Sequence, residues 1–175
     1  EAFAAYRQLV RRFGAPAPGP GAELGLLVAP DAARWAAIPS WEWLRAGVDA
    51  QRADTVMRAV RRAGRLEGLI DRVPAQAREA LRVIPGVGVW TAAEVAHVAF
   101  GDADAVSFGD YHVARNIGWA LVGVELDDAG LADLLTPYAG HRYRVQRLLE
   151  LAGAARPRHG ARMSVPTHLP GRAAR

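Results

Sequence analysis

Asp110 is a carboxylate in a setting where it could do chemistry. It ends a loop that begins at Gly101, and it directly precedes residues 111–121, whose apolar side chains recur at helical spacing. A carboxylate held in place can stabilise positive charge that develops in a transition state and can orient an attacking water. The same position also suits a helix N-cap, which requires no chemistry. Both roles are compatible, so the surrounding sequence must decide between them.

A glycine-containing hairpin precedes this loop. Residues 74–84 and 90–100 both show helical periodicity, and residues 85–88, with the sequence PGVG, join them. Two glycines in four residues allow a sharp turn and leave the main-chain amides uncovered. These amides lie at the start of the second helix, where unpaired donors and the helix dipole favour an anion. A phosphate group fits such a site, although the same turn also occurs in ordinary antiparallel helix pairs.

The composition suits phosphate binding and restricts the chemistry. The net charge is +4 and all 22 basic residues are arginines, whose planar guanidinium binds two phosphate oxygens at once. A general bias towards Ala, Arg and Gly would give the same excess. Because the chain has no lysine, a Schiff base on a lysine side chain is excluded. Because it has no cysteine, disulfides, thiolate-bound zinc, a cysteine nucleophile and a cysteine-held iron–sulfur cluster are excluded.

Helices are the elements that must position these residues. The periodicity predicts an all-α fold with few strands. Residues 14–21, rich in Pro and Gly, offer a place for a lobe boundary. No apolar run approaches the roughly 18 residues of a membrane span, and we expect a cytoplasmic protein, associated with the nucleoid if bacterial. Helices are expected over residues 2–13, 32–37, 41–46, 49–62, 74–84, 90–100, 111–121, 127–135 and 142–151.

Two stretches together resemble the helix-hairpin-helix superfamily of DNA glycosylases. The first is residues 81–92, LRVIPGVGVWTA, and the second is residues 108–115, FGDYHVAR, with the family pattern Asp-x-His-Val-x-Arg. A weaker match is residues 137–144, PYAGHRYR. The resemblance implies a helical DNA glycosylase fold. The sequence starts just after a helical segment that family members carry, so we expect part of the N-terminal region of that fold to be missing.

The resemblance also implies a domain organisation. The glycosylase domain would cover residues 1–155, with the helix-hairpin-helix at 76–100 and the catalytic loop at 101–110. Residues 156–175, which contain Pro, Gly and Arg without periodicity, would form a basic tail.

Roles for individual residues follow from the same resemblance. Asp110 would be the catalytic carboxylate, and Trp90 and Tyr111 would line the pocket for the base. The expected contacts to the DNA backbone are Pro85, Gly86, Val87, Gly88 and Thr91. The backbone carbonyls of Arg82, Ile84 and Val87 could hold a structural Na+ or K+, and no other cofactor is expected.

Trp90 determines the branch of the superfamily that the chain resembles. Members that nick the strand carry a lysine at this position, whereas the alkylation-repair branch related to 3-methyladenine DNA glycosylase II carries tryptophan. The resemblance implies a monomeric, monofunctional enzyme that flips a damaged base, most simply an alkylated purine, from double-stranded DNA and hydrolyses its N-glycosidic bond. An electron-rich indole stacks well on such a base. The alternatives are a DNA-binding module with an incomplete pocket and a mismatch- or adenine-specific glycosylase.

Other residues have plainer explanations. Asp102 and Asp104 are expected to be solvated loop charges, because the remaining ligands of an EF-hand are missing. The residues expected to pack in a core or between lobes are Trp41, Trp43 and Trp119, and the histidines expected to be hydrogen-bonded structural residues are His112 and His141.

Overall fold

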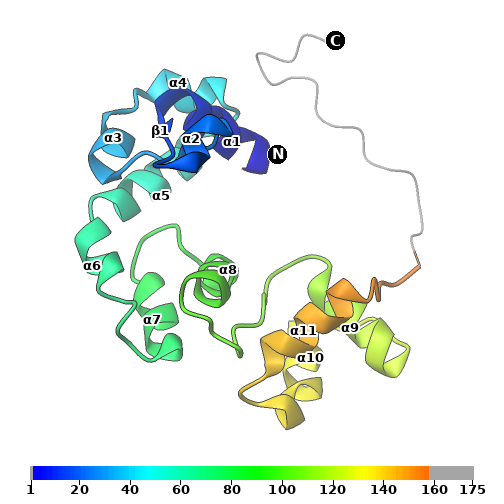
Figure 1. The fold of residues 1–175 in the computed structure, drawn as a ribbon. Helices are drawn as coiled ribbons and strands as arrows, with labels where there is room; N and C mark the ends of the chain where they lie inside the picture. Colours follow the sequence, from blue (N-terminus) through cyan, green and yellow to red (C-terminus); the bar gives the residue numbers. More distant parts are fainter. Residues whose placement is uncertain (1, 158–175) are drawn as a thin grey trace. The chain divides into compact units, whose positions relative to one another are not determined.

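The structure, a computed structural model, describes residues 2–157 and is mostly helical (Figure 1). Within these residues, eleven α-helices and one 3-10 helix stand beside a single pair of two-residue antiparallel strands. The all-α expectation is therefore confirmed. The described chain divides into two compact units, residues 2–64 and residues 65–157.

The first unit packs its helices around a small apolar core. Asp31 and Asp49 start two of these helices, because their carboxylates accept the amides of Arg34 and Arg52 at 2.8 Å. The amide of Arg52 lowers the pKa of Asp49. The buried residues of the core are Ala5, Leu9, Ile38, Trp43 and Ala46. The elements are α1 (Ala2–Phe13), β1 (Ala15–Pro16), α2 (Pro20–Glu23), β2 (Leu27–Val28), α3 (Ala32–Ala37), α4 (Ser40–Arg45), α5 (Ala50–Val60) and the beginning of α6 (Ala63–Glu67).

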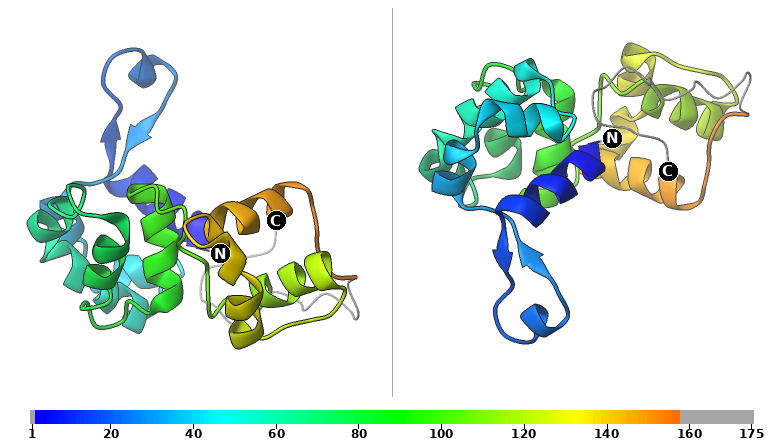
Figure 2. Two further views of the ribbon diagram at one scale, coloured as in Figure 1. Left: turned by 90° about the horizontal axis from the view of Figure 1, so that it is seen from below. Right: turned by 90° about the horizontal axis from the view of Figure 1, so that it is seen from above.

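The Pro- and Gly-rich segment forms an arm of the first unit. A Cβ on Gly14 would lie 2.5 Å from the carbonyl oxygens of Val10 and Val28, so only glycine lets α1 pass this closely to β2. β1 and β2 then pair and carry α2 at their far end (Figure 2). The lobe boundary expected at residues 14–21 is therefore wrong. The two units meet in sequence at residues 64–65, within α6.

The second unit contains the helices that flank the hairpin and the loop at residues 101–110. Pro74 occupies the first turn of α7, where its missing N–H costs nothing. Asp127 caps α10 by accepting the amide of Gly130 at 2.8 Å. α9, α10 and α11 pack around Ile117, Leu131 and Leu135, which are at most 3 % exposed. The elements are α7 (Pro74–Leu81), α8 (Val89–Ala99), α9 (Val113–Val122), α10 (Asp128–Leu134), the 3-10 helix η1 (Thr136–Tyr138) and α11 (Arg142–Leu151).

Two sequence expectations concern the ends and the surroundings of the chain. No helix in residues 2–157 combines the length and the apolar composition needed to cross a membrane. The tail expected over residues 156–175 lies outside the described residues, apart from residues 156–157.

Candidate active site

The hairpin between α7 and α8 is anchored by apolar side chains. Ile84 in the turn is 3 % exposed, and Leu81 at the end of α7 is 6 % exposed. Ala77 on α7 packs with Ala92 on α8, and both are fully buried. Within the turn, the amide of Val87 donates to the Ile84 carbonyl at 2.9 Å. The two helices therefore hold the turn in one conformation.

The turn leaves the N-terminus of α8 open. Gly86 has a φ of +98°, a conformation that favours glycine. Gly88 is the N-cap residue of α8 and has no side chain with which to cap it. The first intrahelical bond is donated by Ala92 to the Gly88 carbonyl, so the amides of residues 89–91 have no intrahelical acceptor. This is the arrangement that binds anions at helix N-termini.

Carbonyls of the same turn are the expected cation ligands. Ile84 uses its carbonyl oxygen to accept the Val87 amide, which leaves one lone pair for a cation. The carbonyls of Arg82 and Val87 lie within the same short turn. Within residues 2–157, no cluster of three or more His, Cys, Asp or Glu side chains could hold a metal.

Asp110 caps a helix and also lines a cavity. Its Oδ1 accepts the amides of His112 at 2.7 Å and Val113 at 3.2 Å, so it caps the start of α9. α9 consequently begins at Val113 and not at the expected Tyr111. Asp110 is only partly buried, and it also lines a cavity. Its carboxylate is therefore fixed by the backbone and accessible from that cavity.

The cavity unites Asp110 with the expected base-stacking residue. It has a volume of about 520 Å3, enough for a purine, and Trp90 contributes to its wall while remaining 45 % exposed. Tyr111 lies outside the residues that line this cavity and is 63 % exposed. Its ring stacks instead against the Arg115 guanidinium, 4.2 Å from the ring centroid. The structure thus brings Trp90 and Asp110 together and places Tyr111 elsewhere.

A buried polar network forms another part of the cavity wall, and sequence reasoning missed it. Ser107 and Gln146 are 1 % and 2 % exposed, and Ser107 Oγ lies 2.6 Å from Oε1 of Glu94. Gln146 Nε2 donates to Ser107 Oγ at 3.0 Å and to Oε1 of Glu150 at 2.9 Å. The available signal was a single carboxylate, Glu94, in the segment 89–96, whose other residues are apolar except for Thr91. The sequence offered no such signal for Gln146, because a glutamine among arginines is typical of an exposed helix surface.

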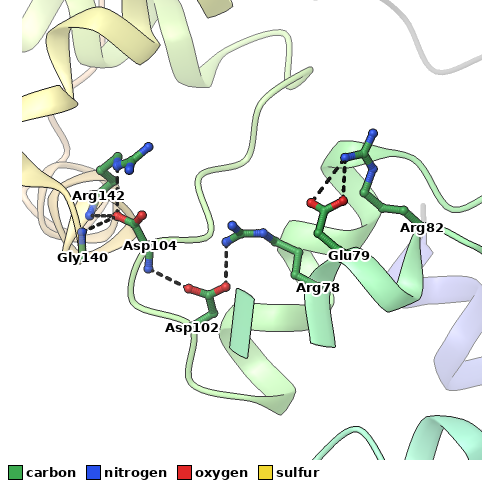
Figure 3. Close-up of polar contacts among 7 residues, drawn as sticks. All are labelled: Arg78, Glu79, Arg82, Asp102, Asp104, Gly140 and Arg142. Carbon is green, nitrogen blue, oxygen red and sulfur yellow. Dashed lines mark hydrogen bonds and ion pairs between the residues drawn. The ribbon is translucent and has the colours of Figure 1, made fainter. Parts of the chain in front are cut away.

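The loop before Asp110 is held by two aspartates (Figure 3). Asp102 is 5 % exposed, and its Oδ2 lies 2.6 Å from Nη1 of Arg78 on α7. Its Oδ1 accepts the amide of Asp104 at 2.9 Å. Asp104 in turn accepts the amides of Gly140 at 2.9 Å and Arg142 at 3.1 Å. The expectation that Asp102 and Asp104 are solvated loop charges is wrong, because both satisfy buried or partly buried donors.

The remaining expected packing and structural residues divide. Trp43 is 4 % exposed and lies in the first core, as expected, whereas Trp41 and Trp119 are 63 % and 42 % exposed and are not core residues. His141 contacts Nη1 of Arg144 through Nδ1 at 2.8 Å, so its structural role is confirmed. His112 is exposed, and the edge of the neighbouring Tyr111 ring packs against it.

The backbone-binding candidates lie together. Pro85, Gly86 and Gly88 are exposed, Val87 is partly buried against the hairpin core, and Thr91 is partly buried in the first turn of α8. They form one continuous turn and helix start, and the same helix carries Trp90 into the cavity wall. The arrangement can therefore hold an anion at the N-terminus of α8. The same helix can also place a planar ring, stacked on Trp90, beside the carboxylate of Asp110.

Comparison with known proteins gives no assignment, because no protein-family model and no curated protein sequence matches the chain.

Proposed function

We propose that the chain is a monofunctional DNA glycosylase of the helix-hairpin-helix superfamily that removes an alkylated purine from double-stranded DNA. The observation that carries the proposal is the double use of α8. Its N-terminus is open to a phosphate, and its second residue, Trp90, shares a cavity with the carboxylate of Asp110. Under this proposal one helix would carry both the phosphate anchor and a side chain that contacts the extruded base, an arrangement that suits base flipping.

The residues of the cavity support hydrolysis at the anomeric carbon. As the N-glycosidic bond breaks, its electron pair leaves with the base and positive charge develops on the sugar. Asp110 stabilises that charge and orients a water, which adds to the anomeric carbon and gives up a proton to the Asp110 carboxylate. The products are the free base and an abasic site. The lack of lysine supports hydrolysis over a Schiff-base mechanism with strand cleavage.

Binding to the duplex is proposed to use the backbone of the hairpin. The amides of residues 89–91 would take a phosphate, with Thr91 and the turn at 85–88 against the strand. A Na+ or K+ on the carbonyls of Arg82, Ile84 and Val87 would add positive charge beside that phosphate. These contacts position the protein and read no sequence.

Release of bases from defined duplexes tests the proposal. The protein, acting as a monomer without an added cofactor, should release 7-methylguanine or 3-methyladenine and leave alkali-labile sites without direct nicking. Asp110→Asn should abolish release and preserve duplex binding. A protein that binds duplex and releases no base from alkylated, deaminated or oxidised substrates is a binding module. Release confined to mismatched adenine indicates the third alternative.

A further inference from the structure

Glu94 is an acidic residue of the cavity for which the proposed reaction has no use. It lies one helical turn after Trp90 on α8, and both residues line the cavity with Asp110. Its side chain is 39 % exposed, whereas Ala93 and Ala96 on the same helix are buried. A carboxylate at the wall of a cavity that also contains an indole and two further carboxylates, those of Asp110 and Glu150, is suited to a ligand with donors or positive charge.

The hydrogen bonds behind Glu94 have a defined direction. The amide of Ser107 donates to Oε1 of Gln146 at 3.1 Å, which fixes the orientation of the Gln146 side-chain amide. Its Nε2 therefore donates to Ser107 Oγ. Because Oγ accepts this bond, its own proton is free to donate to Oε1 of Glu94, 2.6 Å away. Ser107 and Gln146 thus deliver a hydrogen bond to Oε1 of Glu94 and hold its carboxylate in place.

This network occupies one oxygen of the carboxylate. Within residues 2–157, the polar contacts of Glu94 go to Oε1, from Ser107 and from Nε2 of His97 at 3.5 Å. His97 is itself held, because its ring stacks on Tyr143 with centroids 4.0 Å apart. Burial raises the pKa of the Tyr143 phenol, which keeps this partner uncharged. Oε2 of Glu94 is left to accept a hydrogen bond from a ligand in the cavity.

We propose that Glu94 is the specificity-determining residue of the cavity, accepting a hydrogen bond from an N–H group of a flipped purine. The interaction is strongest when alkylation gives the purine a positive charge, because the opposite charges then attract each other across the hydrogen bond. Ser107 and Gln146 are positioning residues that act through Glu94. The inference rests on the proposed function and adds the group that distinguishes a damaged base from a normal one.

The test measures the preference of the protein for a lesion separately from turnover. In an Asp110→Asn background, binding is compared between a duplex with one 7-methylguanine and the same duplex undamaged. Adding Glu94→Gln should lower this preference at least tenfold and leave affinity for undamaged duplex unchanged. With Asp110 intact, Glu94→Gln should lower kcat/KM for 7-methylguanine release by a similar factor. Ser107→Ala should act in the same direction by about twofold to fivefold.

A charge-matched control is Asp133→Asn, since Asp133 is exposed on α10 and lies outside the cavity. It should change neither quantity. Thermal melting checks that each variant is folded. If Glu94→Gln does not fold, the comparison is made with Ser107→Ala instead. If the wild type releases base and the Glu94 or Ser107 variants keep its lesion preference, or lose affinity equally for both duplexes, this inference fails and the proposed function stands. If the wild type releases no base, both fail.

Discussion

Oδ2 of Asp102 lies 2.6 Å from Nη1 of Arg78, and this ion pair ties the loop before Asp110 to the first helix of the hairpin (Figure 3). The side chains of Asp102 and Arg78 are 6 % and 24 % exposed. A pair this far from water leaves an unsolvated charge when one partner is removed. The loop that bears Asp110, the proposed catalytic carboxylate, is therefore fixed to the element that would bind DNA.

Neutralising Asp102 should destabilise the second unit. Asp102→Asn retains an oxygen for the Asp104 amide and removes the charge opposite Arg78, so we expect a loss of about 2 to 3 kcal/mol in the free energy of unfolding. Urea denaturation measures it. The matched control is Glu79→Gln, which breaks an exposed pair with Arg82 and should cost less than about 1 kcal/mol. Equal losses in the two variants would show that the Asp102 pair contributes no more than a surface pair.

The two glycines of the hairpin should respond differently to alanine. A Cβ on Gly88 would meet no atom within 4 Å, and its φ of −87° is open to any residue, so Gly88→Ala should fold and lose at most about 1 kcal/mol, because alanine is a poorer N-cap than glycine. The added methyl group would stand where a phosphate approaches, and we expect duplex affinity to fall about tenfold, or about 1.4 kcal/mol. Fluorescence anisotropy with undamaged duplex measures this.

Gly86→Ala is the companion variant. Its φ of +98° is unfavourable for alanine, so it should lose about 1 to 3 kcal/mol of stability. Wild-type duplex affinity in a folded Gly88→Ala protein would argue against phosphate binding at the start of α8.

Asp110 allows its cap and its chemistry to be separated. In Asp110→Asn the side-chain oxygen can still accept the amides of His112 and Val113, so stability should stay within about 0.5 kcal/mol of the wild type. Asp110→Ala loses the cap and about 1 kcal/mol. Both should lower kcat by a factor of about 100 or more, because each removes the charge. If Asp110→Asn kept the wild-type rate of base release and only the less stable Asp110→Ala lost it, Asp110 would act as a helix cap and not in catalysis.

Trp90 should matter for turnover more than for folding. It is 45 % exposed, so Trp90→Ala should cost much less stability than the about 3 to 5 kcal/mol expected for Trp43→Ala in the first core. Trp90→Phe keeps an aromatic face and should retain most base release, whereas Trp90→Ala should lose at least tenfold in kcat/KM. Single-turnover assays with equal protein concentrations give the comparison. Indistinguishable rates for the two variants would remove stacking from the proposed mechanism.

Local patterns in the sequence predicted most of the helices. Residues 2–13 and 32–37 have the expected bounds, because apolar spacing and an Asp cap define them in the chain itself. The start of α9 was misplaced by two residues, since Asp110 reaches forward to two amides from outside the helix. The short helices α2 and α6 were not foreseen, because four or five residues carry too little periodicity to be recognised.

Contacts between distant residues account for what the sequence could not give. Asp102 and Asp104 follow a helix in a polar loop and look solvated, yet their partners lie 24 and 38 residues away. The side chains of Glu94, Ser107 and Gln146 meet only when α8, the loop at residues 101–110 and α11 fold together. Tyr111 neighbours Asp110 in sequence, but its ring follows Arg115 away from the cavity. Helical spacing can therefore be recognised in the sequence, whereas the contacts that a side chain makes with distant parts of the unit cannot.

α8 also fixes the distance between its open amides and Glu94. Its open amides begin at Val89 and Glu94 follows five residues later, a rise of about 7.5 Å along one rigid helix. If the amides hold a phosphate, this fixed length determines which nucleotide, counted from that phosphate, Glu94 can contact. A flexible loop would not set that position. One extra residue inserted between Trp90 and Glu94 would turn Glu94 by about 100° away from the cavity while leaving the anchor intact. Such a protein should still bind the DNA backbone, but Glu94 would no longer reach the base in the cavity.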